Sequence, residues 1–250
     1  MLVNEIDIYN RQRGINFKKI NARSFIIGCG GTGFWTALFL AMSGVKKLFL
    51  VDNDVIEETN LNRLPYKKED LGRKKTEALR DYIKEVRPVC SVHIIDMKIE
   101  TESECMVIPY QSVIFCCTDS LRSQQLLRKY ANLSSCSYQR VGYDGLVLNV
   151  SNSMPLTFKN PDDLQGYTET PSWVIPAAMA AALGVYSQIY NKVVCMKEIG
   201  EVRWDDNYID ENSKSLIMKK VKDNPACAAC SYIPDAYWTL RGMRGPTITR

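Results

Sequence analysis

The chain has 250 residues, enough for one large α/β domain or for one domain with a short appendage. Hydrophobic residues make up 46% of it and charged residues 24%, as in folded globular chains, which excludes global disorder and a collagen. The formal net charge of +4 is too small for a dedicated nucleic-acid-binding protein, so nucleic acid is not expected as a partner.

The cysteines and the N-terminus bear on the cellular compartment. Nine cysteines could belong to a secreted disulfide scaffold, but residues 1–10 contain Glu5 and Asp7 and lack the basic start and apolar stretch of a signal peptide. We therefore expect a reducing cytoplasm. The longest apolar run, residues 174–190, is shorter than the roughly 20 residues that cross a bilayer, so it predicts a buried helix and no membrane partner.

Strand-like and helix-like segments alternate along the first half of the chain. Because strands that alternate with helices form a parallel sheet, the predicted fold is α/β, a Rossmann-like doubly wound, mostly parallel sheet. The pattern predicts strands over residues 23–27, 47–51, 89–95 and 113–117, and helices over residues 32–43, 70–86 and 119–130, the last with Asp119 as its N-cap.

The pattern changes after residue 137. Residues 139–150 alternate around two glycines as a hairpin does, and the polar residues 150–173 predict a crossover loop. A helix over residues 176–190 returns to the core. Further strands are expected between residues 193 and 220, with 201–204 the clearest, so the sheet is expected to carry a C-terminal strand-containing extension.

A glycine-rich turn follows the first strand and opens the first helix. In this context backbone N–H groups and the helix N-terminus can hold a phosphate that a side chain would exclude. Asp52, at the end of the next strand, can accept hydrogen bonds from a ribose hydroxyl. These features alone do not separate NAD, FAD, S-adenosylmethionine and ATP. The glycines are Gly28, Gly30, Gly31 and Gly33.

Further polar residues are expected at the same edge of the sheet, although hydride transfer does not require them. They are Asp54, Asn60, Arg63, Lys75 and Asp119. Attack of a carboxylate on the α-phosphate of ATP needs cations to hold the triphosphate, which Arg63 and Lys75 could supply. It also needs a carboxylate to hold magnesium, for which Asp119 is suited.

Together these motifs resemble the ThiF/MoeB/HesA-type family of ubiquitin-activating-enzyme-like adenylyltransferases, and within it the compact prokaryotic activators of sulfur-carrier proteins. The resemblance implies that the C-terminal carboxylate of a ubiquitin-like or sulfur-carrier protein, usually ending in Gly-Gly, attacks ATP and leaves as an acyl-adenylate plus pyrophosphate. The motifs are residues 28–33, Asp52, residues 60–63, Gly72-x-x-Lys75, Thr118-Asp119, Tyr9-Asn10-Arg11-Gln12 and Cys227-Ala228-Ala229-Cys230.

The resemblance also implies a role for each matching residue, and a homodimer, because the family's N-terminal arginine enters the neighbouring subunit's nucleotide site. It implies one adenylation domain over residues 1–230, with an N-terminal helix and arm (1–20), a nucleotide-binding core (21–135) and the crossover loop (150–173), then a tail (231–250). The implied roles are backbone contact with phosphate for Gly30, Gly31 and Gly33, ribose contact for Asp52, and nucleotide contact for Gly28 and Asp54. Asn60 and Arg63 are implied to contact phosphates, Lys75 the triphosphate, Asp119 magnesium, and Arg11 the nucleotide of the neighbouring subunit. The catalytic candidates are Arg11, Arg63, Lys75 and Asp119.

The cysteines depart from the family pattern. The family's zinc site needs two Cys-x-x-Cys pairs, and only Cys227 and Cys230 form one, so we expect a pair left without metal. A zinc site completed by other ligands and a reactive dithiol are the alternatives. No cysteine lies between residues 137 and 194 to form the thioester that many relatives use, Thr168 being near that place. The adenylate is therefore expected to pass to a separate thiol, an amine or a conjugating enzyme.

Three other functions stay open at this point. The same fold could adenylate a peptide or a tRNA-borne carboxylate. The glycine turn could serve a nicotinamide-dependent oxidoreductase, which would leave residues 60–63 and Lys75 unexplained. A nucleotide-binding scaffold without chemistry is the third alternative, against which the intact Arg63, Lys75 and Asp119 argue.

Overall fold

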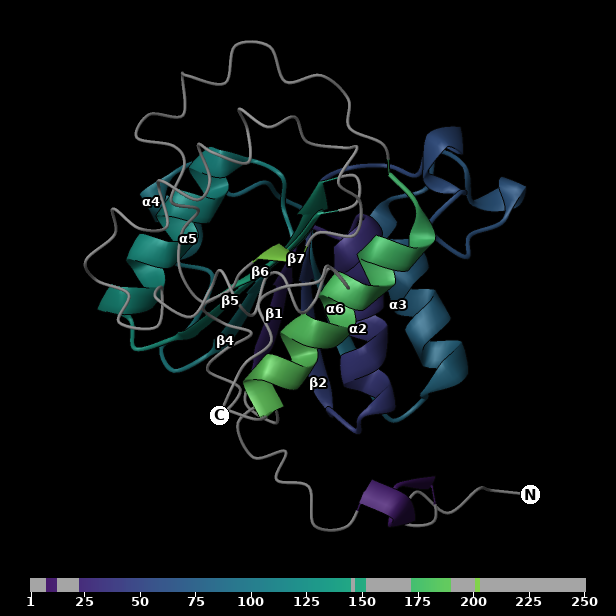
Figure 1. Ribbon diagram of the computed structural model, residues 1–250, viewed down its shortest axis with the longest axis horizontal. Helices are drawn as coiled ribbons and strands as arrows, with labels where there is room; N and C mark the ends of the chain where they lie inside the picture. Colours follow the sequence, from purple (N-terminus) through teal and green to yellow (C-terminus); the bar gives the residue numbers. More distant parts are fainter. Residues whose placement is uncertain (1–7, 13–22, 145–146, 152–171, 190–200, 203–250) are drawn as a thin grey trace, which may run out of the picture.

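A seven-stranded sheet organises the part of the chain that the computed structural model describes, namely residues 8–12, 23–144, 147–151, 172–189 and 201–202 (Figure 1). The strand order is β3-β2-β1-β4-β5-β6-β7, with β1 to β5 parallel and β6 and β7 antiparallel to their neighbours. The predicted α/β, mostly parallel sheet is confirmed. The strands are β1 (Ser24–Ile27), β2 (Lys47–Val51), β3 (Ser91–Ile95), β4 (Val113–Cys116), β5 (Ser137–Asp144), β6 (Val147–Ser151) and β7 (Glu201–Val202).

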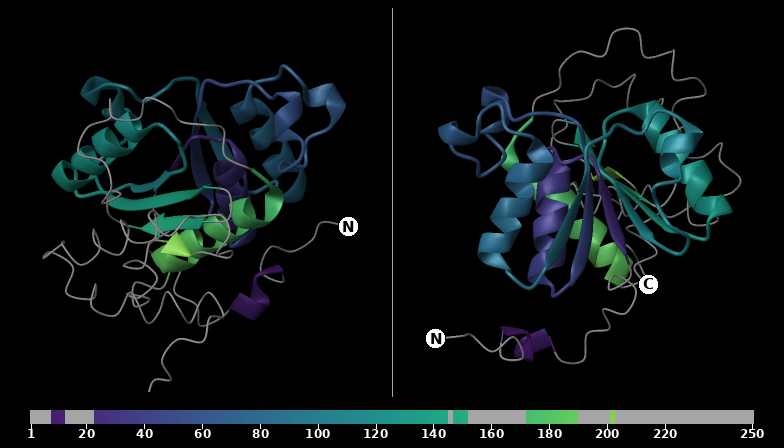
Figure 2. Two further views of the ribbon diagram at one scale, coloured as in Figure 1. Left: turned by 45° about the horizontal axis from the view of Figure 1, so that its top comes forward. Right: turned by 180° about the vertical axis from the view of Figure 1, so that it is seen from behind.

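Helices cover both faces of the sheet (Figure 2). Helices α2, α3 and α6 pack on one face, and α4 and α5 on the other. The central strands β1 and β4 are buried at every position, as parallel strands between two helical layers are. The helices are α2 (Gly31–Met42), α3 (Lys75–Val86), α4 (Glu102–Cys105), α5 (Leu121–Leu133) and α6 (Val174–Ile189), and the 3-10 turns are η1 (Asn10–Gln12), η2 (Glu58–Asn60) and η3 (Lys68–Asp70).

Two predicted helix starts are wrong. Helix α3 begins at Lys75 and not at residue 70, because residues 68–70 form η3 and Gly72 has a φ of +81°, outside the helical region. The N-cap of α5 is Ser120, whose hydroxyl accepts a hydrogen bond from the Ser123 N–H at 3.2 Å. Asp119 is therefore not the cap, and its carboxylate is not used to start that helix.

The later elements agree with the expected change of pattern. The hairpin is present as β5 and β6, and β7 adds a short antiparallel strand beside β6. Helix α6 begins at Val174, with Pro176 in its first turn, where a missing N–H costs no helical hydrogen bond. Residues 152–171 of the expected crossover loop, and the rest of the C-terminal extension, lie outside the described residues. None of the described helices has the length and apolar character needed to cross a bilayer.

Candidate functional site

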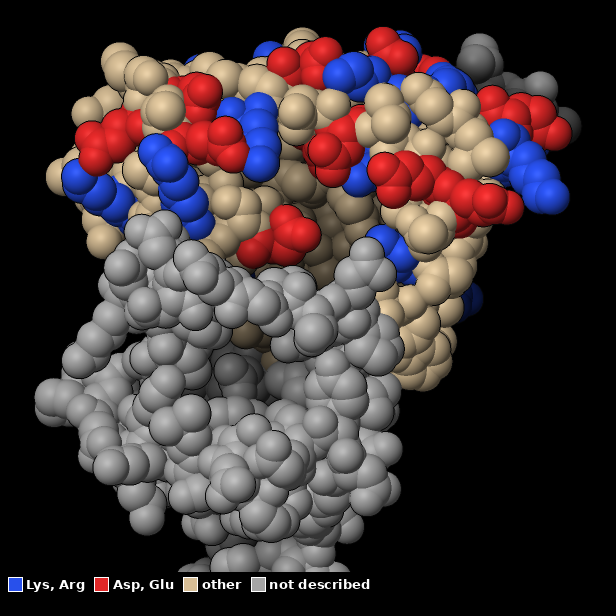
Figure 3. All heavy atoms as spheres, turned by 90° about the horizontal axis from the view of Figure 1, so that it is seen from above, with Lys and Arg blue, Asp and Glu red and all other residues tan. Residues whose placement is uncertain are grey.

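The carboxyl ends of the parallel strands meet at one edge of the sheet, and most of the predicted site residues lie there. Figure 3 looks onto this edge, where acidic and basic side chains gather around a hollow. The glycine turn follows β1, the Asp52 to Lys75 segment follows β2, and Asp119 follows β4. The prediction that these segments converge is confirmed by the sheet order, which places β1 between β2 and β4.

The glycine turn is shaped by close backbone contacts. Gly28 has a φ of +90°, and a Cβ there would lie 2.9 Å from the Thr118 N atom. A Cβ on Gly33 would lie 1.8 Å from the Gly28 carbonyl oxygen, so the first turn of α2 rests directly on the end of β1. Around Gly30, by contrast, no heavy atom of the described chain other than those of Gly30 and its two chain neighbours lies within 4 Å of a Cβ position. The start of α2 thus has room for an anion.

Asp52 ties the end of β2 to this turn. Its Oδ2 accepts a hydrogen bond from the Cys29 N–H at 2.5 Å, and its Oδ1 accepts one from the Asp54 N–H at 2.8 Å. An ionised carboxylate has about four acceptor positions, so further lone pairs remain for a ligand hydroxyl. The sequence-based role at a ribose is compatible with this geometry, but Asp52 also has a structural task that the sequence did not reveal.

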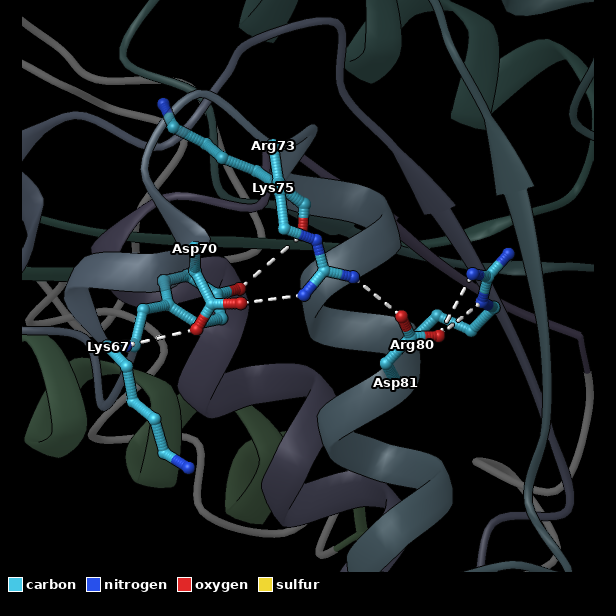
Figure 4. A network of polar contacts seen from close by, with 7 residues as sticks. Lys67, Asp70, Arg73, Lys75, Arg80 and Asp81 are labelled. Carbon is cyan, nitrogen blue, oxygen red and sulfur yellow. Dashed lines mark hydrogen bonds and ion pairs between the residues drawn. The ribbon is translucent and has the colours of Figure 1, made fainter.

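Lys75 is held by Asp54. The Lys75 Nζ lies 2.8 Å from the Asp54 Oδ2, and the lysine side chain is only 12% exposed while that of the aspartate is 61% exposed. In Figure 4 the Lys75 side chain points away from the neighbouring Asp70–Arg73–Asp81 network, whose ion pairs brace the start of α3. Lys75 therefore belongs to the site edge and not to that network.

Two further lysines at this edge were not predicted. Lys74 Nζ donates to the Asn53 carbonyl at 2.8 Å and to the Asp96 carboxylate at 3.0 Å. The pKa of Lys98 is raised, first by its hydrogen bond to Glu100 and further by the charges of Asp54 and Asp119. Paired lysines at a helix N-terminus oppose the helix dipole, and this sequence signal could have singled out Lys74.

Arg63 reaches the glycine turn from the loop after β2. A Cβ on Gly31 would lie 3.2 Å from the Arg63 Cδ, so the arginine stem covers the first turn of α2. The Trp35 indole donates to the Arg63 carbonyl at 3.0 Å and fixes the loop on α2. Asn60 is 6% exposed, and its Oδ1 accepts from the Glu57 N–H at 3.2 Å, so this oxygen serves η2 itself.

Arg11 lies away from the glycine turn of its own chain. Tyr9, two residues earlier, donates to the Ala41 carbonyl at 3.4 Å and approaches Gly44, so this segment sits at the C-terminal end of α2 (Figure 1). The glycine turn is at the other end of this 12-residue helix, about 18 Å along its axis. The structure does not bring Arg11 to the other site residues of the same chain.

The cysteines near the turn are core residues. Burial raises the pKa of Cys29, and it raises the pKa of Cys116 to about 11 and that of Cys117 to about 12. Thiols that stay protonated at neutral pH are poor nucleophiles. Cys227 and Cys230 lie outside the described residues. Within the described ranges, no three histidine, cysteine, aspartate or glutamate side chains group together as a metal site.

Comparisons with known proteins bear on this arrangement. A family model described as the ThiF family matches residues 11–220. The probable adenylyltransferase/sulfurtransferase MoeZ of Mycobacterium tuberculosis is 32% identical over 119 residues, which cover 47% of this chain and 30% of MoeZ. The tRNA threonylcarbamoyladenosine dehydratase of Haemophilus influenzae is 42% identical over 80 residues, 32% of this chain and 31% of that protein.

A solved structure shares the fold. The structure of E. coli MccB with ATP has a TM-score of 0.61 and 24% sequence identity, covering 69% of this chain and 56% of that one. At this identity the likeness concerns the fold alone. The chain spans less than a third of the length of the two curated relatives above.

Proposed function

The chain belongs to the ThiF family, and from that premise we propose that it is an adenylyltransferase that uses ATP and magnesium to activate a carboxylate. The name of MoeZ contains this activity, and MccB was crystallised with ATP. The name of the Haemophilus influenzae relative is that of a dehydratase of a modified tRNA nucleoside, so family membership alone does not name the substrate.

One observation carries the proposal: two cationic side chains from separate loops border the open end of α2. Arg63 covers Gly31, and the largely buried Lys75 is held at the same edge by a single exposed carboxylate. Hydride transfer needs neither cation, whereas a triphosphate that loses pyrophosphate needs both to stabilise its charge. The family match adds to this preference for adenylation over a nicotinamide-dependent reaction.

In the proposed reaction a carboxylate oxygen of the substrate attacks the α-phosphorus of ATP. A new P–O bond forms, the bond from the α-phosphorus to the oxygen bridging to the β-phosphate breaks, and pyrophosphate leaves with that electron pair. The turn at Gly30 and Gly31 would hold phosphate through backbone N–H groups. Lys75 would exchange Asp54 for a phosphate oxygen, and Asp52 would accept from the ribose.

Asp119 is suited to holding magnesium. It is exposed, follows the central strand β4, and is not used as a helix cap. Magnesium takes most of its ligands from phosphate and water, with one or two protein carboxylates, so one side chain at this edge is enough. When bound, the ion would neutralise part of the triphosphate charge.

The proposed substrate is the C-terminal tail of a ubiquitin-like or sulfur-carrier protein ending in Gly-Gly, with a separate thiol or conjugating enzyme as acceptor. A cytoplasmic homodimer in which Arg11 serves the partner's nucleotide would explain why this arginine lies far from its own glycine turn. The proposed unit is one adenylation domain over residues 1–230. The Cys227 and Cys230 pair is proposed to carry no metal, and stoichiometric zinc found by elemental analysis of the pure protein would overturn this expectation.

ATP–pyrophosphate exchange with magnesium tests the function. The substrates are a panel of proteins ending in Gly-Gly, their tail-truncated forms and a short peptide. We expect exchange that needs the tail and is lost in Asp119→Ala, while Glu102→Ala, which removes an exposed carboxylate from α4, keeps it. Exchange retained by Asp119→Ala would contradict the role of that residue. If NADH and not ATP raises the thermal unfolding midpoint, the oxidoreductase is favoured instead.

A further inference from the structure

A chain of hydrogen bonds links the Arg63 loop to the start of α6 and to β5. The Arg63 Nη1 donates to the Asn62 Oδ1 at 3.0 Å, and the Asn62 Nδ2 donates to the Ser172 carbonyl at 2.6 Å. The Ser172 hydroxyl is in turn hydrogen-bonded to the Tyr143 hydroxyl. We name these four residues, Asn62, Arg63, Tyr143 and Ser172, the Gly31 circuit, because its two ends meet at that glycine.

The ends of the circuit meet over the first turn of α2. A Cβ on Gly31 would lie 3.2 Å from the Tyr143 Oη and also 3.2 Å from the Arg63 Cδ. A phenol hydroxyl and a guanidinium stem therefore flank the same backbone position at the helix N-terminus. A hydroxyl placed there can donate a hydrogen bond to an anion that the helix end attracts.

The proton count permits such a donation, since either hydroxyl can be the donor in the Tyr143–Ser172 hydrogen bond. A phenol has one proton, and the Ser172 hydroxyl can satisfy the tyrosine oxygen by donating to it, which leaves the Tyr143 proton for another acceptor. A hydrogen bond received by a hydroxyl strengthens the bond that the hydroxyl gives. Asn62 holds the backbone carbonyl of Ser172, which keeps this residue beside Tyr143.

We propose that Tyr143 is a phosphate-binding residue of the nucleotide site, with its hydroxyl donating to the anion held over Gly31, and that Ser172 and Asn62 are positioning residues for it. This inference rests on the proposed function, because it needs a phosphate at the start of α2. It adds to the motif residues a tyrosine from β5, two strands away from β1 in the sheet. It also connects the residue two positions before α6 to the phosphate.

Calorimetric titration of the full chain with magnesium ATP, inorganic pyrophosphate and adenosine tests the inference. Tyr143→Phe removes only the hydroxyl, and Tyr138→Phe makes the same change on the same strand but outside the circuit. We expect Tyr143→Phe to weaken ATP binding about tenfold, as for one hydrogen bond to a charged group, and to leave adenosine binding unchanged. Tyr138→Phe should bind ATP as the unmodified protein does.

A second variant separates positioning from binding. Ser172→Ala should weaken ATP binding less than Tyr143→Phe, and should add nothing to it in the double variant, since both changes act through one hydroxyl. Thermal unfolding of each variant checks that the fold is kept.

The possible failures are distinguishable. ATP binding by Tyr143→Phe within twofold of the unmodified protein, or an equal loss of adenosine binding, would overturn the inference alone. If the unmodified protein binds neither ATP nor pyrophosphate, the proposed function falls, and the inference with it.

Discussion

Two glycines of the same turn should differ in what a single added methyl group changes: Gly33→Ala should lower the stability of the fold, and Gly30→Ala should weaken ATP binding. A Cβ on Gly33 would lie 1.8 Å from the Gly28 carbonyl oxygen, so helix and strand would have to separate by about 1.5 Å to reach ordinary contact. The obstacle is backbone that is held in register, because the Gly28 N–H donates to the Val51 carbonyl at 2.8 Å. Gly33→Ala therefore cannot be relieved by a rotamer change.

The expected cost follows from overpacking. Extra methyl groups in packed cores cost roughly 1–3 kcal/mol, and a backbone clash belongs at the upper end, so we expect about 3 kcal/mol for Gly33→Ala. With a urea m-value of about 3 kcal/mol/M, the unfolding midpoint should fall by about 1 M. Gly30→Ala has open space and should change the unfolding free energy by less than about 0.5 kcal/mol while weakening ATP binding.

Urea unfolding followed by circular dichroism, with ATP titration of each variant, measures both effects. A Gly33→Ala protein within about 1 kcal/mol of the unmodified one would refute the packing argument. Full ATP affinity in Gly30→Ala would show that the open space at the start of α2 is not where phosphate binds.

Three other outcomes are expected. Ser120→Ala should lower the unfolding free energy by about 1 kcal/mol because it removes the α5 cap, and Asp119→Ala should leave it unchanged; equal losses in urea unfolding would contradict this assignment. With pKa values of about 11 and 12, the buried Cys116 and the partly buried Cys117 should resist iodoacetamide at pH 8 until the protein is unfolded, and rapid labelling seen by peptide mass mapping would contradict these raised pKa values. The pKa of Asp70 is lowered, first by the hydrogen bond from the Lys67 backbone N–H and further by the hydrogen bond and charge of Arg73. The ionised carboxylate therefore stabilises the fold above its ordinary pKa of 3.8, and this stabilisation is lost as the pH falls from 3.8 through the lowered pKa. The difference in unfolding free energy between the unmodified protein and Asp70→Asn should close below pH 4, and a constant difference from pH 3 to 7 would be inconsistent.

Local sequence patterns predicted the helices and strands whose bounds depend mainly on neighbouring residues in the chain. The strand Lys47–Val51 was predicted at its observed bounds because a short apolar run between polar residues has few alternatives. The start of α3 was misjudged because Leu71 fits a helical spacing, whereas the positive φ of Gly72 interrupts the helix there. Asp119 and Ser120 are both good caps by residue type, and only the geometry separates them.

The site was predictable where a motif lies beside one strand, and not where distant segments meet. The glycine turn, Asp52 and Lys75 follow strand ends and were placed correctly at the sheet edge. The contact of Tyr143 with Gly31 joins residues more than a hundred positions apart, and the local sequence around neither residue predicts it. The effect of the Asp54 and Asp119 charges on the pKa of Lys98 likewise depends on which strands are neighbours in the sheet.

The Gly31 circuit has a consequence for the order in which the protein matures. Gly31 leaves the ribosome about 140 residues before Ser172, a delay of roughly 7–30 seconds at ordinary elongation rates. For most of that interval the nascent chain carries the glycine turn and Arg63 but lacks Tyr143 and Ser172, which contact them in the folded protein. A ligand that binds the chain more tightly when the Gly31 circuit is formed than when it is not would stabilise the chain only once β5 and α6 have docked. A bound nucleotide would therefore act on the last stage of folding and not on the first.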